Sequence, residues 1–146
     1  MNRVNQHSRV SGSKDEKVVK EWINLMNTFE WTHFTTFTTC YPLSLSSART
    51  KMERMANYIS QILKQNLTIF WVAEPHKSDG YHIHALFNIE DKKNSTIKKV
   101  WDKVSGSKPG NSNKCTVEVY QKGMGGAGYT VKNLMSEKVD YDISIK

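Results

Sequence analysis

The sequence predicts an α+β fold in which helices cover one face of a central antiparallel sheet and the other face is open. Two observations favour this class. Segments with strand-like alternation are interleaved along the chain with amphipathic helical segments. The run 80–89, Gly-Tyr-His-Ile-His-Ala-Leu-Phe-Asn-Ile, places an apolar row on one face of a strand and its two histidines on the other.

The first part of the chain predicts a tail, two helices and a strand. Residues 1–12 are polar and basic, so we expect a flexible tail. A capping-box spacing that begins at Ser13 precedes a helix near 14–29. Aromatic and β-branched residues predict a strand over 31–39. Apolar residues at three- and four-residue intervals then predict a helix over 47–65.

The middle of the chain predicts a hairpin followed by a helix. Residues 67–75 are apolar and β-branched, and a polar turn joins them to the histidine strand at 80–89. We expect these two strands to pair antiparallel. Asn94 or Ser95 can cap a third helix, which ends at Gly106.

The last part of the chain predicts a strand and a short helix. Apolar and polar residues alternate over 114–122, and glycines then break the pattern before a helix near 127–136. The last ten residues predict either an edge strand or a frayed end. We expect one domain over 13–140 and a C-terminal tail over 141–146.

From residue 31 the predicted order is β-α-β-β-α-β-α, the split βαβ arrangement of ferredoxin-like and RRM-like domains. The apolar row of the histidine strand then lies under the helices. The open face carries His82 and His84 and, by alternation, Glu118, Tyr120 and Lys122. Such a face suits a flat or extended ligand.

Composition limits the classes of binding partner and the cellular compartments that we expect for this protein. A net charge of +7 favours a polyanion, most often a nucleic acid. Cys40 and Cys115 lack the spacing of a zinc knuckle or a disulfide framework, so we expect reduced thiols. The sequence has no signal-peptide pattern and no run of about 18 apolar residues. We therefore expect a soluble, cytoplasmic protein without a membrane partner.

His82 and His84 are candidate metal ligands because two imidazoles on one strand face can share an ion. Glu74 is the nearest carboxylate on the partner strand. It lies opposite His82 if paired residue numbers sum to 156, which needs a three- or five-residue connection. His76 has the same parity as Glu74 and is a weaker candidate. This set suits either a divalent ion that polarises a phosphate or a zinc ion that activates water.

Tyr129 is a candidate nucleophile. It lies one helical turn before Lys132, and a cation beside a phenol favours the ionised, nucleophilic form. The preceding glycine-rich turn would let the tyrosine move toward the metal. Tyr-x-x-Lys also occurs often on solvated helix faces, so its position after the histidine strand carries the argument.

Three stretches in this order resemble motifs of the HUH endonucleases, specifically the rolling-circle replication initiators of small plasmids and viruses. They are Phe34-Thr-Thr-Phe-Thr38, Tyr81-His-Ile-His-Ala-Leu-Phe87 and Gly128-Tyr-Thr-Val-Lys132. The resemblance implies that His82, His84 and Glu74 bind Mn²⁺ or Mg²⁺. It also implies that Tyr129 attacks a DNA phosphodiester, assisted by Lys132, to leave a 5′-phosphotyrosine and a free 3′-hydroxyl.

By the same resemblance, residues 13–140 form a single HUH nuclease-like domain that acts on single-stranded or hairpin origin DNA. Tyr120, Lys122 and Lys132 are its candidate DNA-binding residues. Larger viral members carry a helicase domain, for which this sequence has no counterpart after the tyrosine helix. We therefore expect a host or separate helicase and polymerase to extend the nicked strand.

Three other functions stay open at the level of sequence. A single-tyrosine transposase of the same superfamily is the closest, although those proteins usually have a glutamine-bearing motif where this chain has Lys132 and Asn133. A non-catalytic single-strand binder would use Tyr81 and Tyr120 as stacking platforms, but the RNP aromatic pattern is missing. In a zinc hydrolase, Tyr129 would be incidental.

Overall fold

The computed structural model describes residues 16–77, 79–90, 95–106, 114–123, 125–132, 134, 136 and 138–146. The expected tail at 1–12 and the Ser13 cap lie outside these residues. Helical residues within the described part begin at 16 and continue to 26, so the expected N-terminal helix is present. The predicted α+β class is confirmed.

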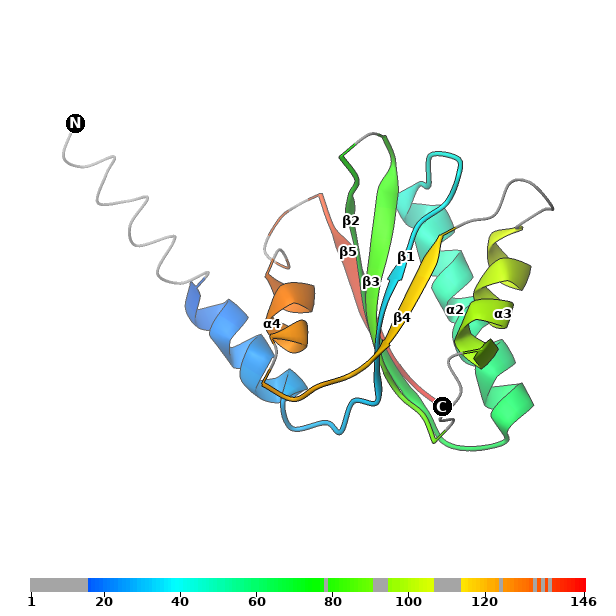
Figure 1. The fold of residues 1–146 in the computed structure, drawn as a ribbon. Coiled ribbons are helices and arrows are strands. Elements are labelled where there is room, and N and C mark those ends of the chain that lie inside the picture. Colours follow the sequence, from blue (N-terminus) through cyan, green and yellow to red (C-terminus); the bar gives the residue numbers. More distant parts are fainter. Residues whose placement is uncertain are drawn as a thin grey trace.

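A single antiparallel sheet forms the centre of the molecule (Figure 1). Its five strands lie in the order β4-β1-β3-β2-β5, and each neighbouring pair is antiparallel. The strands are β1 (His33–Phe37), β2 (Thr68–Pro75), β3 (Tyr81–Asn88), β4 (Cys115–Val119) and β5 (Asp140–Ile145). The histidine strand β3 therefore occupies the middle of the sheet.

Helices α2 (Leu45–Leu63) and α3 (Ser95–Ser105) cover one face of the sheet (Figure 1). The larger core lies between them and the sheet, and it includes the predicted row of Ile83, Ala85 and Phe87. Trp101 of α3 stacks on Phe37 of β1 at 4.5 Å between ring centroids. Burial of this apolar area is the main stabilising term for the domain.

The opposite face is covered in part, which differs from the bare face that we expected. The N-terminal helix and α4 (Gly126–Val131) lie against it (Figure 1). They enclose a second core whose buried members are Met26, Trp31, Phe70, Val72, Leu86, Ala127, Val131 and Leu134. The reason is that β2 is buried on both faces from Ile69 to Glu74, so its second apolar row also needs a cover.

The chain ends in a strand of the sheet. Of the two alternatives for the last ten residues, the structure has the edge strand: β5 pairs with β2. Arg49 of α2 holds this strand through ion pairs of 2.8 Å with both Asp140 and Asp142. Residues 141–145 thus belong to the sheet rather than to a tail.

The β2–β3 hairpin meets the condition set for Glu74, because Glu74 lies directly opposite His82. The His76 N–H donates to the Gly80 carbonyl at 2.9 Å and closes the turn. Gly80 has φ of +72°, and a Cβ there would lie 2.5 Å from the Leu43 backbone nitrogen. Only glycine fits this turn, which sets how β2 and β3 align.

Candidate metal centre and tyrosine

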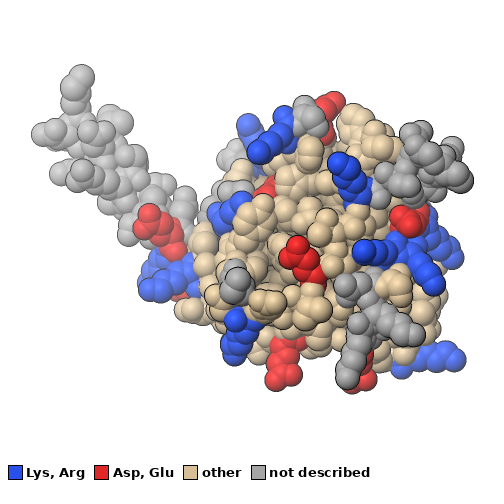
Figure 2. Space-filling model, in the orientation of Figure 1, with Lys and Arg blue, Asp and Glu red and all other residues tan. Residues whose placement is uncertain are grey.

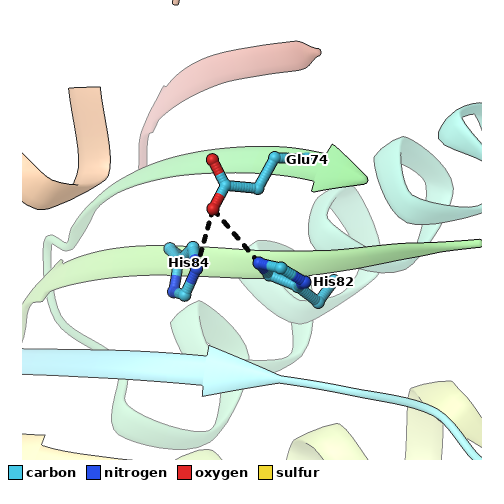
Figure 3. A group of neighbouring side chains, drawn as sticks. All are labelled: Glu74, His82 and His84. Carbon is cyan, nitrogen blue, oxygen red and sulfur yellow. Dashed lines mark hydrogen bonds and ion pairs between the residues drawn. The ribbon is translucent and has the colours of Figure 1, made fainter. Parts of the chain in front are cut away.

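Glu74, His82 and His84 lie together on the face of the sheet that α2 and α3 leave free (Figure 3). One ligand atom from each residue lies within 4.8 Å of the others. The Glu74 Oε1 atom is 3.1 Å from Nε2 of His82 and 3.1 Å from Nε2 of His84. Glu74 and His84 are buried, and His82 is half-buried. The hairpin register alone brings these three side chains together.

The hydrogen bonds of the two histidines differ. His82 Nε2 is hydrogen-bonded to Glu74. His84 Nε2 lies at the same distance from that carboxylate but outside hydrogen-bonding geometry, and this nitrogen is buried without a hydrogen-bond partner. His84 Nδ1 is 3.2 Å from Thr36 Oγ1. When His84 donates its Nδ1 proton to Thr36, the lone pair of Nε2 faces the carboxylate.

In that tautomer a lone pair and a carboxylate face each other in a buried site, an arrangement that a cation bound between them would stabilise. Two imidazoles and one carboxylate form a donor set that binds divalent ions with coordination positions left over for a substrate. The Thr36 hydroxyl fixes the orientation of the His84 ring through Nδ1, the nitrogen that does not face Glu74. Hydrogen bonds to the non-coordinating nitrogen of a histidine ligand have this role in metal sites. These three residues therefore fit a divalent metal ion, and the donor set does not identify which one.

Tyr129 of α4 lies next to this cluster. Its ring centroid is 4.9 Å from that of His84, and the two rings are nearly perpendicular. The Tyr129 side chain is 46% exposed. Helix α4 presents the ring there because Ala127 and Val131, on its other side, are buried in the second core. The tyrosine is accessible to a ligand and lies beside a candidate metal ligand.

Lys132 lies over the Tyr129 ring, with 3.7 Å between its Nζ and the ring centroid. This is a close cation–π contact at an exposed site. The Phe34 ring is nearly perpendicular to that of Tyr129, with 6.1 Å between centroids, and it stacks parallel to His84 at 6.1 Å. Phe34 therefore bridges the tyrosine and the histidine.

The remaining predicted residues lie at different distances from the cluster. The His76 ring is 5.2 Å from that of His82, but His76 is exposed and is not among the clustered ligand atoms. His76 and Tyr81 line a hollow of about 400 Å³ at the end of the hairpin. Lys122 borders a separate hollow of about 240 Å³ with Trp31.

A wider groove begins at Tyr129 and has a volume of about 740 Å³. Its lining residues are Phe34, Val117, Glu118, Val119, Tyr120, Gln121, Gly125, Gly126 and Tyr129. Tyr120 and Glu118 thus lie near the tyrosine. Figure 2 shows basic side chains around the periphery of one side of the molecule and mostly uncharged atoms in its middle.

Sequence reasoning missed the roles of Thr36 and Phe34 at this site. Both lie on the same face of β1, and their Cα partners on β3 are His84 and Leu86. The alternation of Phe34 and Thr36 within 31–39 could have placed them on one face. Nothing local to either strand gives the pairing of β1 with β3.

The fold and the site together define an α+β protein with a five-stranded antiparallel sheet and a buried cluster of two histidines and a glutamate. Comparisons with protein-family models and with curated proteins find no match. Among solved structures, the chain is similar to the hypothetical protein ORF119 from Sulfolobus islandicus rod-shaped virus 1, at a TM-score of 0.51 and 20% identity. The match covers 82% of this chain and 91% of that chain.

At that identity the similarity supports the fold. No helix in the described ranges is long and apolar enough to cross a membrane.

Proposed function

We propose that this protein is a metal-dependent endonuclease of the HUH type, which nicks and rejoins single-stranded DNA at a replication origin through a covalent bond to Tyr129. The observation that carries the proposal is the contact of the Tyr129 ring with His84, 4.9 Å between centroids. A nucleophile of the right kind thus lies beside the candidate metal ligands. The order of the three sequence motifs supports the same assignment.

In the proposed reaction, the Tyr129 Oη attacks the phosphorus of one phosphodiester and loses its proton. The new P–Oη bond forms as the P–O3′ bond breaks. Solvent takes the proton that Oη loses and supplies one to the departing O3′, so the upstream strand leaves with a free 3′-hydroxyl. The downstream strand stays on Tyr129 as a 5′-phosphotyrosine. The covalent link keeps the energy of the phosphodiester, and attack by a 3′-hydroxyl can therefore rejoin a strand.

Glu74, His82 and His84 would hold Mn²⁺ or Mg²⁺ in this proposal. The ion would supply Lewis-acid polarisation of a phosphate oxygen. Thr36 holds His84 in the ligand orientation through the 3.2 Å contact with Nδ1.

Lys132 has two proposed roles. Its ammonium lies 3.7 Å from the centroid of the Tyr129 ring, where its positive charge can offset the negative charge that develops as the tyrosine attacks the phosphate. The same charge can pair with a DNA phosphate. Tyr120 offers a ring on which a base can stack, and Lys122 offers another phosphate contact. A host or separate helicase and polymerase would act after the nick.

The test is formation of an adduct with a pool of random-sequence single-stranded oligonucleotides in Mn²⁺. We expect wild-type protein to form an adduct that survives denaturation and Tyr129→Phe to form none. Tyr58→Phe is the matched control, because Tyr58 also has a lysine over its ring, Lys103 at 4.5 Å, but packs against the larger core on the other face. This control should keep full activity.

Other results would contradict the proposal in distinct ways. Cleavage undiminished in Tyr129→Phe would make water the nucleophile, as in a zinc hydrolase. Binding of the pool without cleavage would identify a passive single-strand binder. Adducts that form only on the paired ends of an insertion element would identify the transposase.

A further inference from the structure

The groove beside Tyr129 runs along the edge strand β4 and has walls suited to a planar ring. Phe34, Tyr120 and Tyr129 all line it. A Cβ on Gly126 would lie 3.0 Å from the Tyr120 ring, so the glycine lets this ring lie directly against the start of α4. The volume of the groove, about 740 Å³, falls within the range of about 300–1,000 Å³ usual for small-ligand sites. Aromatic walls of this kind stack on nucleobases.

The charge in the groove is the opposite of what a phosphate needs. Glu118 is the one charged side chain among the described lining residues, in a protein of net charge +7. The ion pairs of the described residues join Arg49 to two aspartates and the histidines to Glu74, and none of them uses Glu118. A free carboxylate repels phosphate and accepts hydrogen bonds from N–H groups.

Glu118 also faces the right way. Its Cα partner across β1–β4 is Phe34, and opposed residues share a face of the sheet. Phe34 in turn contacts both Tyr129 and His84. The carboxylate is thus placed on the face where the reacting phosphate would bind, one strand further toward the edge.

We propose that this groove binds the base of a nucleotide next to the cleaved phosphate and that Glu118 selects guanine there. This specificity rests on the proposed function. Guanine presents two adjacent donors, N1–H and N2–H, on its Watson–Crick edge, and a carboxylate can accept both at once. Adenine and cytosine present one amino donor beside an acceptor that repels the second carboxylate oxygen. The thymine N3–H lies between two carbonyls, which makes thymine the poorest fit.

The test measures binding separately from cleavage. Fluorescence anisotropy in EDTA, without any metal, compares a short oligothymidylate with versions that carry one central guanine, adenine or cytosine. We expect wild-type protein to prefer the guanine version over oligothymidylate by about tenfold, the effect of one bidentate base contact. Glu118→Gln should lose this preference and bind the adenine and cytosine versions more tightly than wild-type protein does, because a glutamine amide has one donor and one acceptor, which match the amino donor and ring acceptor of both bases. Glu53→Gln, an exposed change on α2, should keep the guanine preference.

Equal binding of all four oligonucleotides by wild-type protein would overturn the inference, and so would a guanine preference that survives Glu118→Gln. These results are independent of the adduct assay. If adducts form in Mn²⁺ but binding shows no base preference, the proposed function holds and the guanine site does not. If the base preference shifts as expected but no adduct forms, the groove reads bases without the proposed chemistry.

Discussion

The candidate metal centre makes the most direct quantitative prediction. A ligand that binds only the folded state raises the free energy of unfolding by RT ln(1 + [L]/Kd). Mn²⁺ at a concentration of about 100 times its Kd therefore adds about 2.7 kcal/mol. For a domain of 146 residues, each kcal/mol shifts Tm by about 4 °C. We expect Mn²⁺ to raise Tm by about 10 °C.

The same arithmetic predicts the response of Glu74→Gln. The Glu74 oxygen lies 3.1 Å from both imidazoles, so its amide replacement removes the one negative charge of the cluster. Mutation of a residue that only hydrogen-bonds to a metal ligand weakens metal affinity by up to about 100-fold. Loss of the carboxylate ligand itself should therefore raise Kd by at least about 100-fold. At the same Mn²⁺ concentration the stabilisation falls to about 0.4 kcal/mol, and the Tm shift to about 2 °C.

Differential scanning fluorimetry with and without Mn²⁺ measures this shift within each variant. Any effect of the substitution on the metal-free protein then cancels from the comparison. Glu53→Gln removes a carboxylate from an exposed position on α2 and should keep the full shift. A Mn²⁺ shift in Glu74→Gln as large as in wild-type protein would refute the assignment of Glu74 as a ligand.

Three further predictions concern other parts of the chain. Burial raises the pKa of the Cys115 thiol to about 12, so native protein at pH 8 should take up one iodoacetamide, at the exposed Cys40, and two only after denaturation, as counted by mass spectrometry. Gly80→Ala should lower the free energy of unfolding, measured by urea titration, by about 2 kcal/mol or more, because alanine disfavours the positive φ and its Cβ would clash with backbone. An unchanged urea midpoint would contradict the conformation assigned to Gly80. Lys132→Met should slow adduct formation with Tyr129 by about tenfold in a quenched time course, while Lys132→Arg should keep most of the rate. Equal rates for Lys132→Met and wild-type protein would show that the lysine has no role in the mechanism.

The sequence predicts the hairpin and its cluster because the information there is local. Strand alternation puts His82 and His84 on one face, and a short connection that contains Gly80 allows few registers. One of these registers puts Glu74 opposite His82, and the structure has it. The hairpin register is enough to predict this cluster, since all three side chains come from two strands that are adjacent in the chain.

Contacts between strands far apart in the chain could not be predicted in this way. The contact of Thr36 with His84 depends on the pairing of β1 with β3, which are separated by a helix and another strand. The burial of the second sheet face by the N-terminal helix and α4 could have been predicted in part, because the sequence contains a pattern that indicates it. Met26 continues the apolar stripe of the N-terminal helix, and Phe70 and Val72 are a second apolar row on β2. These two patterns together indicate a second core.

The two halves of the proposed active site lie on different kinds of element. The candidate metal ligands lie on β2 and β3, which are bonded on both sides within the sheet. Tyr129 lies on α4, a helix of six residues, too short to be stable alone, which follows Gly123 and Gly125 at φ of +89° and +82°. In the proposed mechanism the sheet would hold the phosphate in fixed geometry while Tyr129 approaches it from a separate element and later carries the strand.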